Sequence, residues 1–217
     1  MVRILAVSDE VVEQLDGKAV RALRPDVVAG CGDVPFERLG ELAEAADAPL
    51  VFVPGNHDPD LSGYRGTRSG LVVRAGLPTT PPWPPGALNA DGRLVDAGGL
   101  RFGGLGGSLR YRSGPNQYTE RQQGRRARRL VARARWRRLW DGRRVDVVLT
   151  HAPVRALGDD DDPVHEGFAA FAALASALQP ELLLHGHVQP QFGDRREHRL
   201  GTTRVLNVFD HLMVEAG

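Results

Sequence analysis

The sequence contains one cysteine, Cys31, few aromatic residues (6%) and no long apolar run. A single cysteine excludes a disulfide framework and a thiolate-rich zinc site, so any metal must be held by His, Asp, Asn or Gln side chains. No stretch reaches the ~20 apolar residues that span a bilayer, and VRILAVSD follows Met1 without the features of a signal peptide. These absences predict a cytoplasmic protein without a membrane partner.

The chain also carries almost no net charge, +1 at neutral pH, but its charges are unevenly distributed. Eleven of the 24 residues from Arg121 to Arg144 are arginine, whereas GDDDDP, residues 158–163, is acidic. With 217 residues, of which 41% are hydrophobic, the chain can close one sizeable core. We therefore expect a single domain, residues 1–217.

Short runs of Val, Leu and Ile alternate with helical patterns, which is typical of an α/β protein. The predicted strands are residues 4–8, 26–30, 50–53, 145–150 and 181–185. The predicted helices are residues 11–23, 36–46, 118–140 and 163–178, the last with Asp162 as N-cap and Pro163 at its first position. Residues 92–107, GRLVDAGGLRFGGLGG, predict a hairpin that turns at Gly98 and Gly99.

Polar residues recur at the carboxyl ends of the predicted strands. They are Asp9, Asp33, Asn56-His57-Asp58, His151 and His187. One such residue is ordinary in a turn, but strand ends of an α/β sheet converge on one edge, where ligands bind. Because five strand ends carry mostly metal-competent side chains, we interpret this edge as a metal site.

The motifs around these residues resemble those of the calcineurin-like metallophosphoesterases. They occur in that family's order: SD at residues 8–9, GD at 32–33, GNHD at 55–58, THAP at 150–153 and GHVQ at 186–189. The resemblance spans nearly the whole chain, and GNHD is its most specific motif. It implies a four-layer α/β/β/α sandwich with a two-metal centre, which hydrolyses phosphomonoesters or phosphodiesters.

The resemblance also implies a role for each matching residue. Asp33 would bridge two metals, and Asn56, His151 and His187 would complete one site. Asp9 would bind the other metal, but this chain has Val11 and Gln189 where the family places two further histidines. The resemblance thus implies one firm site and one weak site, in which the Gln189 carbonyl could supplement the two aspartates.

Oxygen-rich ligands of this kind suit Mn²⁺ or Mg²⁺ better than zinc, and we expect Mn²⁺, with Fe, Zn and Mg as alternatives. The implied mechanism is attack on phosphorus by a metal-bound hydroxide, with His57 donating a proton to the leaving oxygen and Asp58 orienting it. A rival hypothesis is a phosphate- or nucleotide-binding pseudoenzyme that retains one metal site, because the departures at Val11 and Gln189 impair catalysis more than binding.

Three further residues are candidates for binding a small phosphoester substrate. His165 follows the predicted cap Asp162, where a helix start would favour a phosphate, although an exposed histidine fits equally well. Arg110 and Arg112 lie in a glycine-rich segment, residues 104–120, which could close over the site or be a plain structural loop. His185, in contrast, is expected to pack in the core.

The arginine-rich helix has an approximate inward stripe of Ala127, Leu130, Val131, Ala134, Leu139 and Trp140. Its other faces are strongly basic, so a nucleic-acid partner is an alternative. We disfavour it because no stacking aromatic residues interleave the arginines. The sequence does not indicate an oligomeric state.

Overall fold

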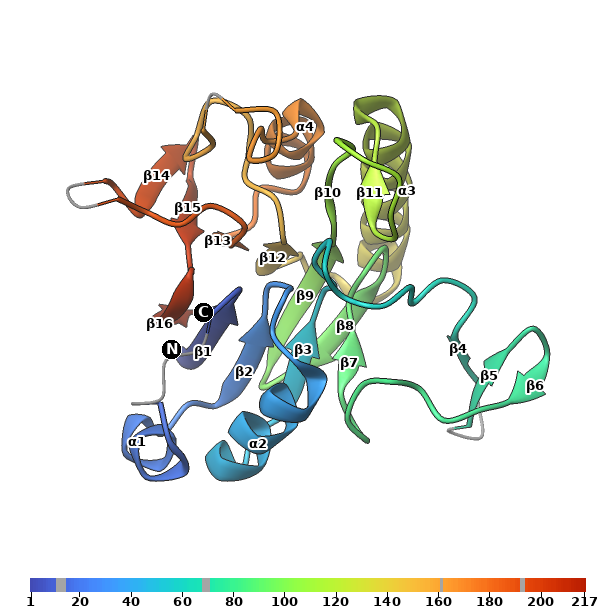
Figure 1. Ribbon diagram of the computed structural model, residues 1–217, viewed down its shortest axis with the longest axis vertical. Helices are drawn as coiled ribbons and strands as arrows, with labels where there is room; N and C mark the ends of the chain where they lie inside the picture. The colour runs from blue at the N-terminus through green and yellow to red at the C-terminus, as the bar shows by residue number, and fades with distance from the viewer. Residues whose placement is uncertain (11–14, 68–70, 161, 192–193) are drawn as a thin grey trace.

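Two β-sheets lie face to face in the computed structural model, which describes residues 1–10, 15–67, 71–160, 162–191 and 194–217 (Figure 1). The first sheet has the order β16 (Asp210–Ala216), β1 (Val2–Ser8), β2 (Val27–Gly30), β3 (Leu50–Phe52) and β7 (Leu88–Asn89). The second has the order β14 (Glu197–Leu200), β15 (Thr203–Asn207), β13 (Leu182–His185), β12 (Val147–Thr150), β9 (Leu100–Leu105) and β8 (Leu94–Ala97).

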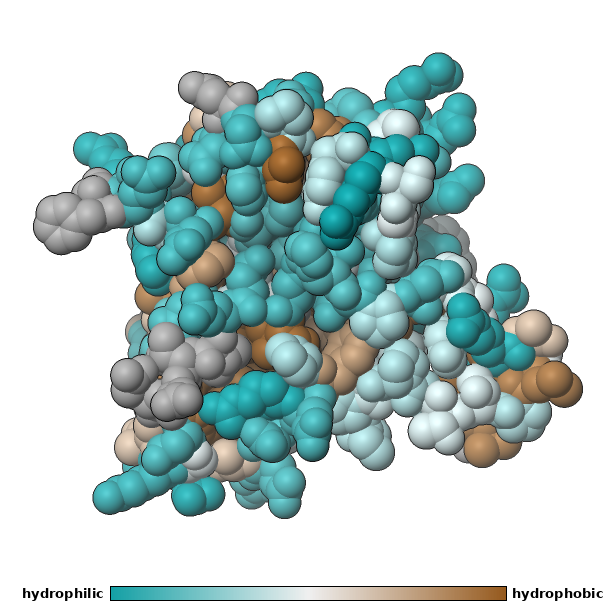
Figure 2. Space-filling view, in the orientation of Figure 1, coloured by the Kyte–Doolittle hydropathy of each residue, from teal (hydrophilic) through white to brown (hydrophobic). Residues whose placement is uncertain are grey.

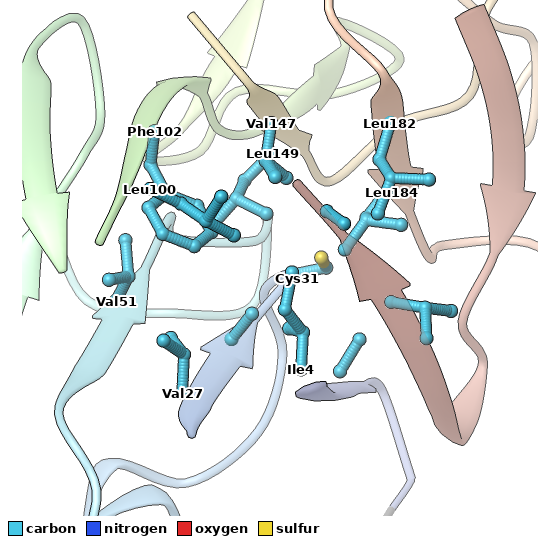
Figure 3. Close-up of a cluster of buried hydrophobic side chains, with 14 of the residues drawn as sticks. Ile4, Val27, Cys31, Val51, Leu100, Phe102, Val147, Leu149, Leu182 and Leu184 are labelled. Atoms are coloured by element: carbon cyan, nitrogen blue, oxygen red, sulfur yellow. The ribbon is translucent and has the colours of Figure 1, made fainter. Parts of the chain in front are cut away.

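Alternate residues of these strands fill the space between the sheets (Figure 3). Ile4 and Val27 point inward from the first sheet, and Phe102, Leu149 and Leu184 from the second, all of them fully buried. The intervening residues point to the outer faces, which are apolar as well. This double burial explains why the strands read as continuous apolar runs in the sequence.

Helices cover both outer faces. On the first sheet, α1 (Gly17–Leu23) and α2 (Phe36–Ala46) pack through Val20, Leu39 and Leu42. On the second, α3 (Glu120–Asp141) and α4 (Ala169–Leu178) pack through side chains that include Leu130 and Phe171. The resulting four layers confirm the α/β/β/α sandwich expected from the sequence. None of the helices in the described ranges is long and apolar enough to cross a bilayer.

Most neighbouring strands are parallel. In the first sheet β1 pairs with β2 and β2 with β3, and in the second β9 pairs with β12, β12 with β13 and β13 with β15. Their carboxyl ends therefore meet at one edge of the molecule, as the polar residues predicted. Hydrophilic residues cover the middle of the face seen in Figure 2.

Two small sheets lie outside the sandwich. One consists of β4 (Arg65–Gly66), β5 (Val72–Arg74) and β6 (Leu77–Pro78), and it projects at the lower right of Figure 1. Figure 2 shows apolar residues on this projection, where Leu71 and Leu77 are exposed. The other pairs β10 (Ser108–Leu109) with β11 (Gln117–Tyr118) and closes the loop between them.

The hairpin and the second helix match their predictions. Gly98 and Gly99 adopt positive φ values of 55° and 83° between β8 and β9, and α2 has the predicted bounds. The first four residues of the predicted helix 11–23 lie outside the described residues, and α1 is capped by Asp16, which accepts a hydrogen bond from Ala19 N.

The start predicted for the last helix is wrong. α4 begins at Ala169 rather than Pro163, and its N-cap is Phe168. Glu120, from α3, accepts hydrogen bonds from the first two amides of α4, those of Ala169 and Ala170. The N-terminus of α4 is thus satisfied by a distant carboxylate, while Asp162 accepts the amides of a separate turn.

The inward stripe predicted for the arginine-rich helix is correct for Ala127, Leu130 and Ala134, which are buried, but wrong for Leu139 and Trp140. These two side chains are 84% and 76% exposed. The last turn of α3 contacts the sandwich through ion pairs of Arg137 and Asp141 instead.

Candidate metal centre

Several of the polar residues leave their strands through a tight backbone turn. Asp9, Asp33 and His187 have φ values of 62°, 57° and 69°, in the left-handed region. Asp and His adopt this region more readily than most residues with a Cβ. Three side chains from three strand ends are thereby directed over the same edge of the sandwich.

His151 occupies the centre of the cluster and is fully buried. Its Nε2 lies 2.9 Å from Oδ1 of Asn56 and 3.2 Å from Oδ2 of Asp33. Its Nδ1 lies 2.9 Å from the carbonyl oxygen of Cys31, which only accepts, so Nδ1 carries a hydrogen. Asn56 donates through Nδ2 to the hydroxyl of Tyr111, and its carbonyl is thereby directed toward His151.

The charges of His151 and Asp33 depend on each other. Burial alone would lower the pKa of His151, but the hydrogen bond and charge of Asp33 raise it from 6.5 to about 9. Burial alone would raise the pKa of Asp33, but the hydrogen bond and charge of His151 lower it below its ordinary value. Without a metal, the Nε2 of His151 is therefore protonated at neutral pH, and its hydrogen lies between the acceptor oxygens of Asn56 and Asp33.

Asp9 and His187 complete the cluster. The Oδ2 of Asp9 accepts hydrogen bonds from Ser8 Oγ at 2.6 Å and from the amide of His187 at 2.8 Å. The His187 Nε2 lies 2.8 Å from the carbonyl oxygen of Val164, which leaves Nδ1 as the ring nitrogen with a free lone pair. Burial and the charge of His151 lower the pKa of His187 to about 3, so this lone pair is available at neutral pH.

These atoms fit a divalent cation. Ligand atoms of Asp9, His151 and His187 all lie within 4.8 Å of one another, and Asn56 Oδ1 and Asp33 Oδ2 face His151 Nε2. Without a cation, the proton on His151 Nε2 is the hydrogen that lies between the acceptor oxygens of Asn56 and Asp33. A cation in the place of that proton would satisfy them, with each imidazole held by a backbone carbonyl on its other nitrogen.

His57 and Asp58 follow Asn56 at the same edge. The amide of His57 donates to Asp33 Oδ1 at 2.8 Å, while its side chain is exposed. Asp58 is buried, and its Oδ2 accepts the amides of Asp33 and Gly55; burial raises its pKa. Asp58 thereby joins the turn that carries His57 to the backbone of Asp33, and its role in orienting His57 remains a prediction.

The predicted substrate contacts lie around this cluster. The His165 ring is 5.4 Å from that of His187, and its Nδ1 bonds Asp162. It is on a loop and not at a helix start, so the phosphate argument based on a helix N-terminus is wrong. Arg112 lies over the Tyr111 ring, whereas Arg110 bonds the Gln117 carbonyl and Gln122.

The weak second site remains a prediction. Gln189 is exposed, and Val11 lies outside the described residues. A separate exposed group, Asp160, Asp162 and His165, also brings its ligand atoms within 4.8 Å of one another. The structure thus places one buried ligand group and one exposed group on neighbouring loops. His185, expected in the core, is fully buried.

Sequence reasoning missed the residues that hold the ligands in place. Ser8 bonds Asp9, Tyr111 bonds Asn56, and Asn116 Nδ2 donates to the carbonyls of Gly55 and Asp58. The sequence offered only weak signals: Ser8 precedes a ligand, and the other two lie in a glycine-rich segment. The backbone carbonyls of Cys31 and Val164, which bond His151 and His187, could not be recognised in the sequence because every residue has a carbonyl.

The fold and the ligand cluster together are those expected of the metal-dependent phosphoesterase class. A sequence model of the calcineurin-like phosphoesterases matches residues 5–191, so the chain belongs to that family. The crystal structure of TT1561 of Thermus thermophilus is similar, with a TM-score of 0.57 and 16% identity over 96% of this chain and 89% of that one. A 5'-nucleotidase precursor from the same organism has a TM-score of 0.46 and 13% identity over 95% and 48%. No curated protein matches the chain.

Proposed function

We propose that the protein hydrolyses a small phosphomonoester or phosphodiester at a cation held by Asp9, Asp33, Asn56, His151 and His187. The acceptor atoms of Asn56 and Asp33 that converge on His151 Nε2 carry this proposal, because only a proton or a cation satisfies them. When bound, the cation supplies a Lewis acid that polarises the phosphoryl group and lowers the pKa of water. The mixed nitrogen and oxygen ligands favour Mn²⁺, with Fe, Zn and Mg as alternatives.

The neighbouring residues provide proton transfer and phosphate binding. His57 donates a proton to the leaving oxygen; its exposure beside Asn56 and the bond of its amide to Asp33 support this role. His165 lies next to His187, and Arg112 next to Tyr111, so both flank the cluster and bind phosphoryl oxygens. Arg110, with its bonds to Gln117 and Gln122, mainly holds the segment in place.

The test combines metal content with turnover. Purified protein is analysed by mass spectrometry for bound metal, then assayed with p-nitrophenyl phosphate and bis(p-nitrophenyl) phosphate in Mn²⁺, Mg²⁺, Fe²⁺ and Zn²⁺. We expect bound metal and hydrolysis of at least one substrate. His57→Ala should retain the metal and lose most of the rate, whereas a protein that binds no cation would contradict the proposal.

A second candidate is a phosphate-binding pseudoenzyme with one metal. Gln189, which is exposed and stands where the resemblance implies a histidine, favours it because a second cation would lack a strong ligand there. This candidate predicts bound metal and phosphate affinity, measured by calorimetry, without hydrolysis under any of the metal conditions.

A further inference from the structure

The carboxyl-terminal end of α3 exposes three large apolar side chains. Trp136, Leu139 and Trp140 are 64%, 84% and 76% exposed, and the two indole rings lie 5.6 Å apart. Their spacing of three and four residues places them on one side of the helix. We call these three residues the tryptophan patch. Contiguous apolar exposure of this kind on a protein surface marks an interaction site.

The patch does not result from a loosely packed helix end. Arg137 and Asp141, on the inward side of the same turns, bind residues of the second sheet: Arg137 pairs with Asp96, and Asp141 accepts a 2.7 Å bond from Arg101. Arg101 is only 2% exposed. Because these ion pairs fix the rotation of the helix, the tryptophan patch is directed outward by the fold. The sequence predicted that Leu139 and Trp140 face inward, so it gave no sign of this patch.

The surroundings of the patch are strongly basic. α3 contains nine arginines and two acidic residues, Glu120 and Asp141, and the latter is neutralised by Arg101. Within the described part of the chain, seven exposed arginines on α3 or just beyond it form no hydrogen bond or ion pair: Arg121, Arg125, Arg128, Arg129, Arg135, Arg138 and Arg144. Apolar side chains among free guanidinium groups complement a surface that is negatively charged outside and apolar beneath.

We propose that the tryptophan patch and its arginines dock the protein on a bilayer rich in anionic phospholipid. Tryptophan is enriched at the interface between headgroups and acyl chains, and nearby arginines are attracted to lipid phosphates. A second copy of this chain is a poor occupant, because self-association through this face brings arginines against arginines. The sequence-based expectation of no membrane partner rested on the lack of a segment long enough to span a bilayer, and it did not consider docking on the membrane surface.

An acidic protein is a weaker candidate than a bilayer. The neighbouring groove between α3 and α4, about 750 Å³ in volume, is lined by Gly124, Ala127 and Ala173 among others, and the tryptophan patch lies outside it. Interface tryptophans of protein complexes are typically buried in pockets of the partner or beside them. Here the indoles project from the end of a helix, which suits insertion between lipid headgroups.

The position of the patch also determines which way the metal centre faces. Near its start, α3 contacts the metal-centre edge, where Gln123 donates to the carbonyl of Gly106; at its end, it contacts Arg101 at the beginning of β9. The patch therefore lies at the opposite end of the sheet from the ligands. A protein docked in this way keeps its metal centre toward the water, so its substrate is reached from the aqueous phase.

Vesicle sedimentation tests the proposal. The whole protein is mixed with vesicles of dioleoyl phosphatidylcholine alone or with an equal amount of dioleoyl phosphatidylglycerol, at about 50 mM and about 500 mM NaCl. We expect binding to the anionic vesicles at low salt and a weaker association at high salt. The double variant Trp136→Ala/Trp140→Ala should bind at least tenfold less, and Arg135→Glu/Arg138→Glu should lose the salt-sensitive part.

The matched control removes exposed apolar groups elsewhere, in the variant Leu71→Ala/Leu77→Ala, and should bind like the wild type. Tryptophan fluorescence gives a second readout: Trp83 is buried, so a blue shift with anionic vesicles reports on the patch. Circular dichroism checks that each variant is folded. The proposal is overturned if wild-type protein does not bind anionic vesicles, if the tryptophan variant binds equally, or if soluble polyglutamate produces the same fluorescence shift.

Discussion

Gly186 lies directly against Ser8, so close that a Cβ at position 186 would overlap the Ser8 hydroxyl and Oδ2 of Asp9. The β13 strand end and the β1 strand end can approach each other only because Gly186 has no side chain. The same approach allows the amide of His187 to bond Asp9.

Gly186→Ala should therefore disrupt the metal centre more than the fold. We expect at least a tenfold weaker affinity for Mn²⁺ and a loss of stability of about 1–3 kcal/mol, the usual cost of overpacking. Metal titration by calorimetry and chemical denaturation measure the two effects. Gly66→Ala is the control, because no atom of the described residues other than its two chain neighbours lies within 4 Å of its Cβ position; equal behaviour of the two variants would contradict the prediction.

His151→Ala and His187→Ala should each remove tight metal binding and reduce any hydrolysis by more than about 100-fold, because each deletes a nitrogen ligand. The circular dichroism spectrum should stay close to that of the wild type. His198→Ala, on β14 and outside the cluster, is the control and should keep its metal. Wild-type metal content in either ligand variant would show that the centre is assigned incorrectly.

Gln189→His should raise affinity for a second cation, because imidazole is a stronger donor than an amide carbonyl. If hydrolysis is limited by that cation, the rate at low Mn²⁺ should rise as well. Val11→His should act in the same direction, and the double variant should exceed either single variant. Metal stoichiometry and rate against Mn²⁺ concentration are measured for all four proteins; identical curves would contradict a degraded second site.

His185 should make the metal-free protein sensitive to acid. It is fully buried, its Nε2 has no partner among the described residues, and burial lowers its pKa from 6.5 to about 4. The unfolded chain gains this proton below pH 6.5 and the folded chain only near pH 4. The stability contributed above pH 6.5 is therefore lost as the pH falls toward 4, by about 3 kcal/mol at about 1.4 kcal/mol for each pKa unit.

Urea denaturation at pH 7.5 and pH 4.5 checks this for metal-stripped wild type and His185→Gln. The variant should lose less stability between the two pH values, whatever its absolute stability. His187 is present in both proteins and its effect cancels. An equal loss in both would mean that His185 is not the residue that titrates.

Much of the sandwich could be predicted from local sequence patterns. Strands buried on both faces produce runs such as LLLH before Gly186, and helix 36–46 has a clear apolar stripe, so both were located to within about two residues. The residues that we propose as ligands could be located in the same way, because each lies within four residues of the end of a strand. Signals of this kind depend only on near neighbours in the chain.

The incorrect predictions concern positions whose structure is determined by residues far away in the sequence. Pro163 after Asp162 is a normal helix start, but Glu120 from another helix caps α4 six residues later. Leu139 lies at the next position of the apolar stripe of α3. The bond between Arg101 and Asp141 nevertheless turns another side of the helix end toward the sheet, and Leu139 is exposed. The carbonyl groups that orient the histidines belong to the backbone, and no side-chain pattern could indicate them.

The left-handed backbone at Asp9, Asp33 and His187 has a consequence for directed evolution. A residue with a Cβ in this conformation is less stable than glycine by roughly 1 kcal/mol. Glycine at any of the three positions would relax the backbone and delete a ligand in one step. A library screened for heat resistance without metal would therefore drift toward inactive clones, whereas screening with Mn²⁺ present would retain the ligands, because bound metal stabilises only the chains that keep them.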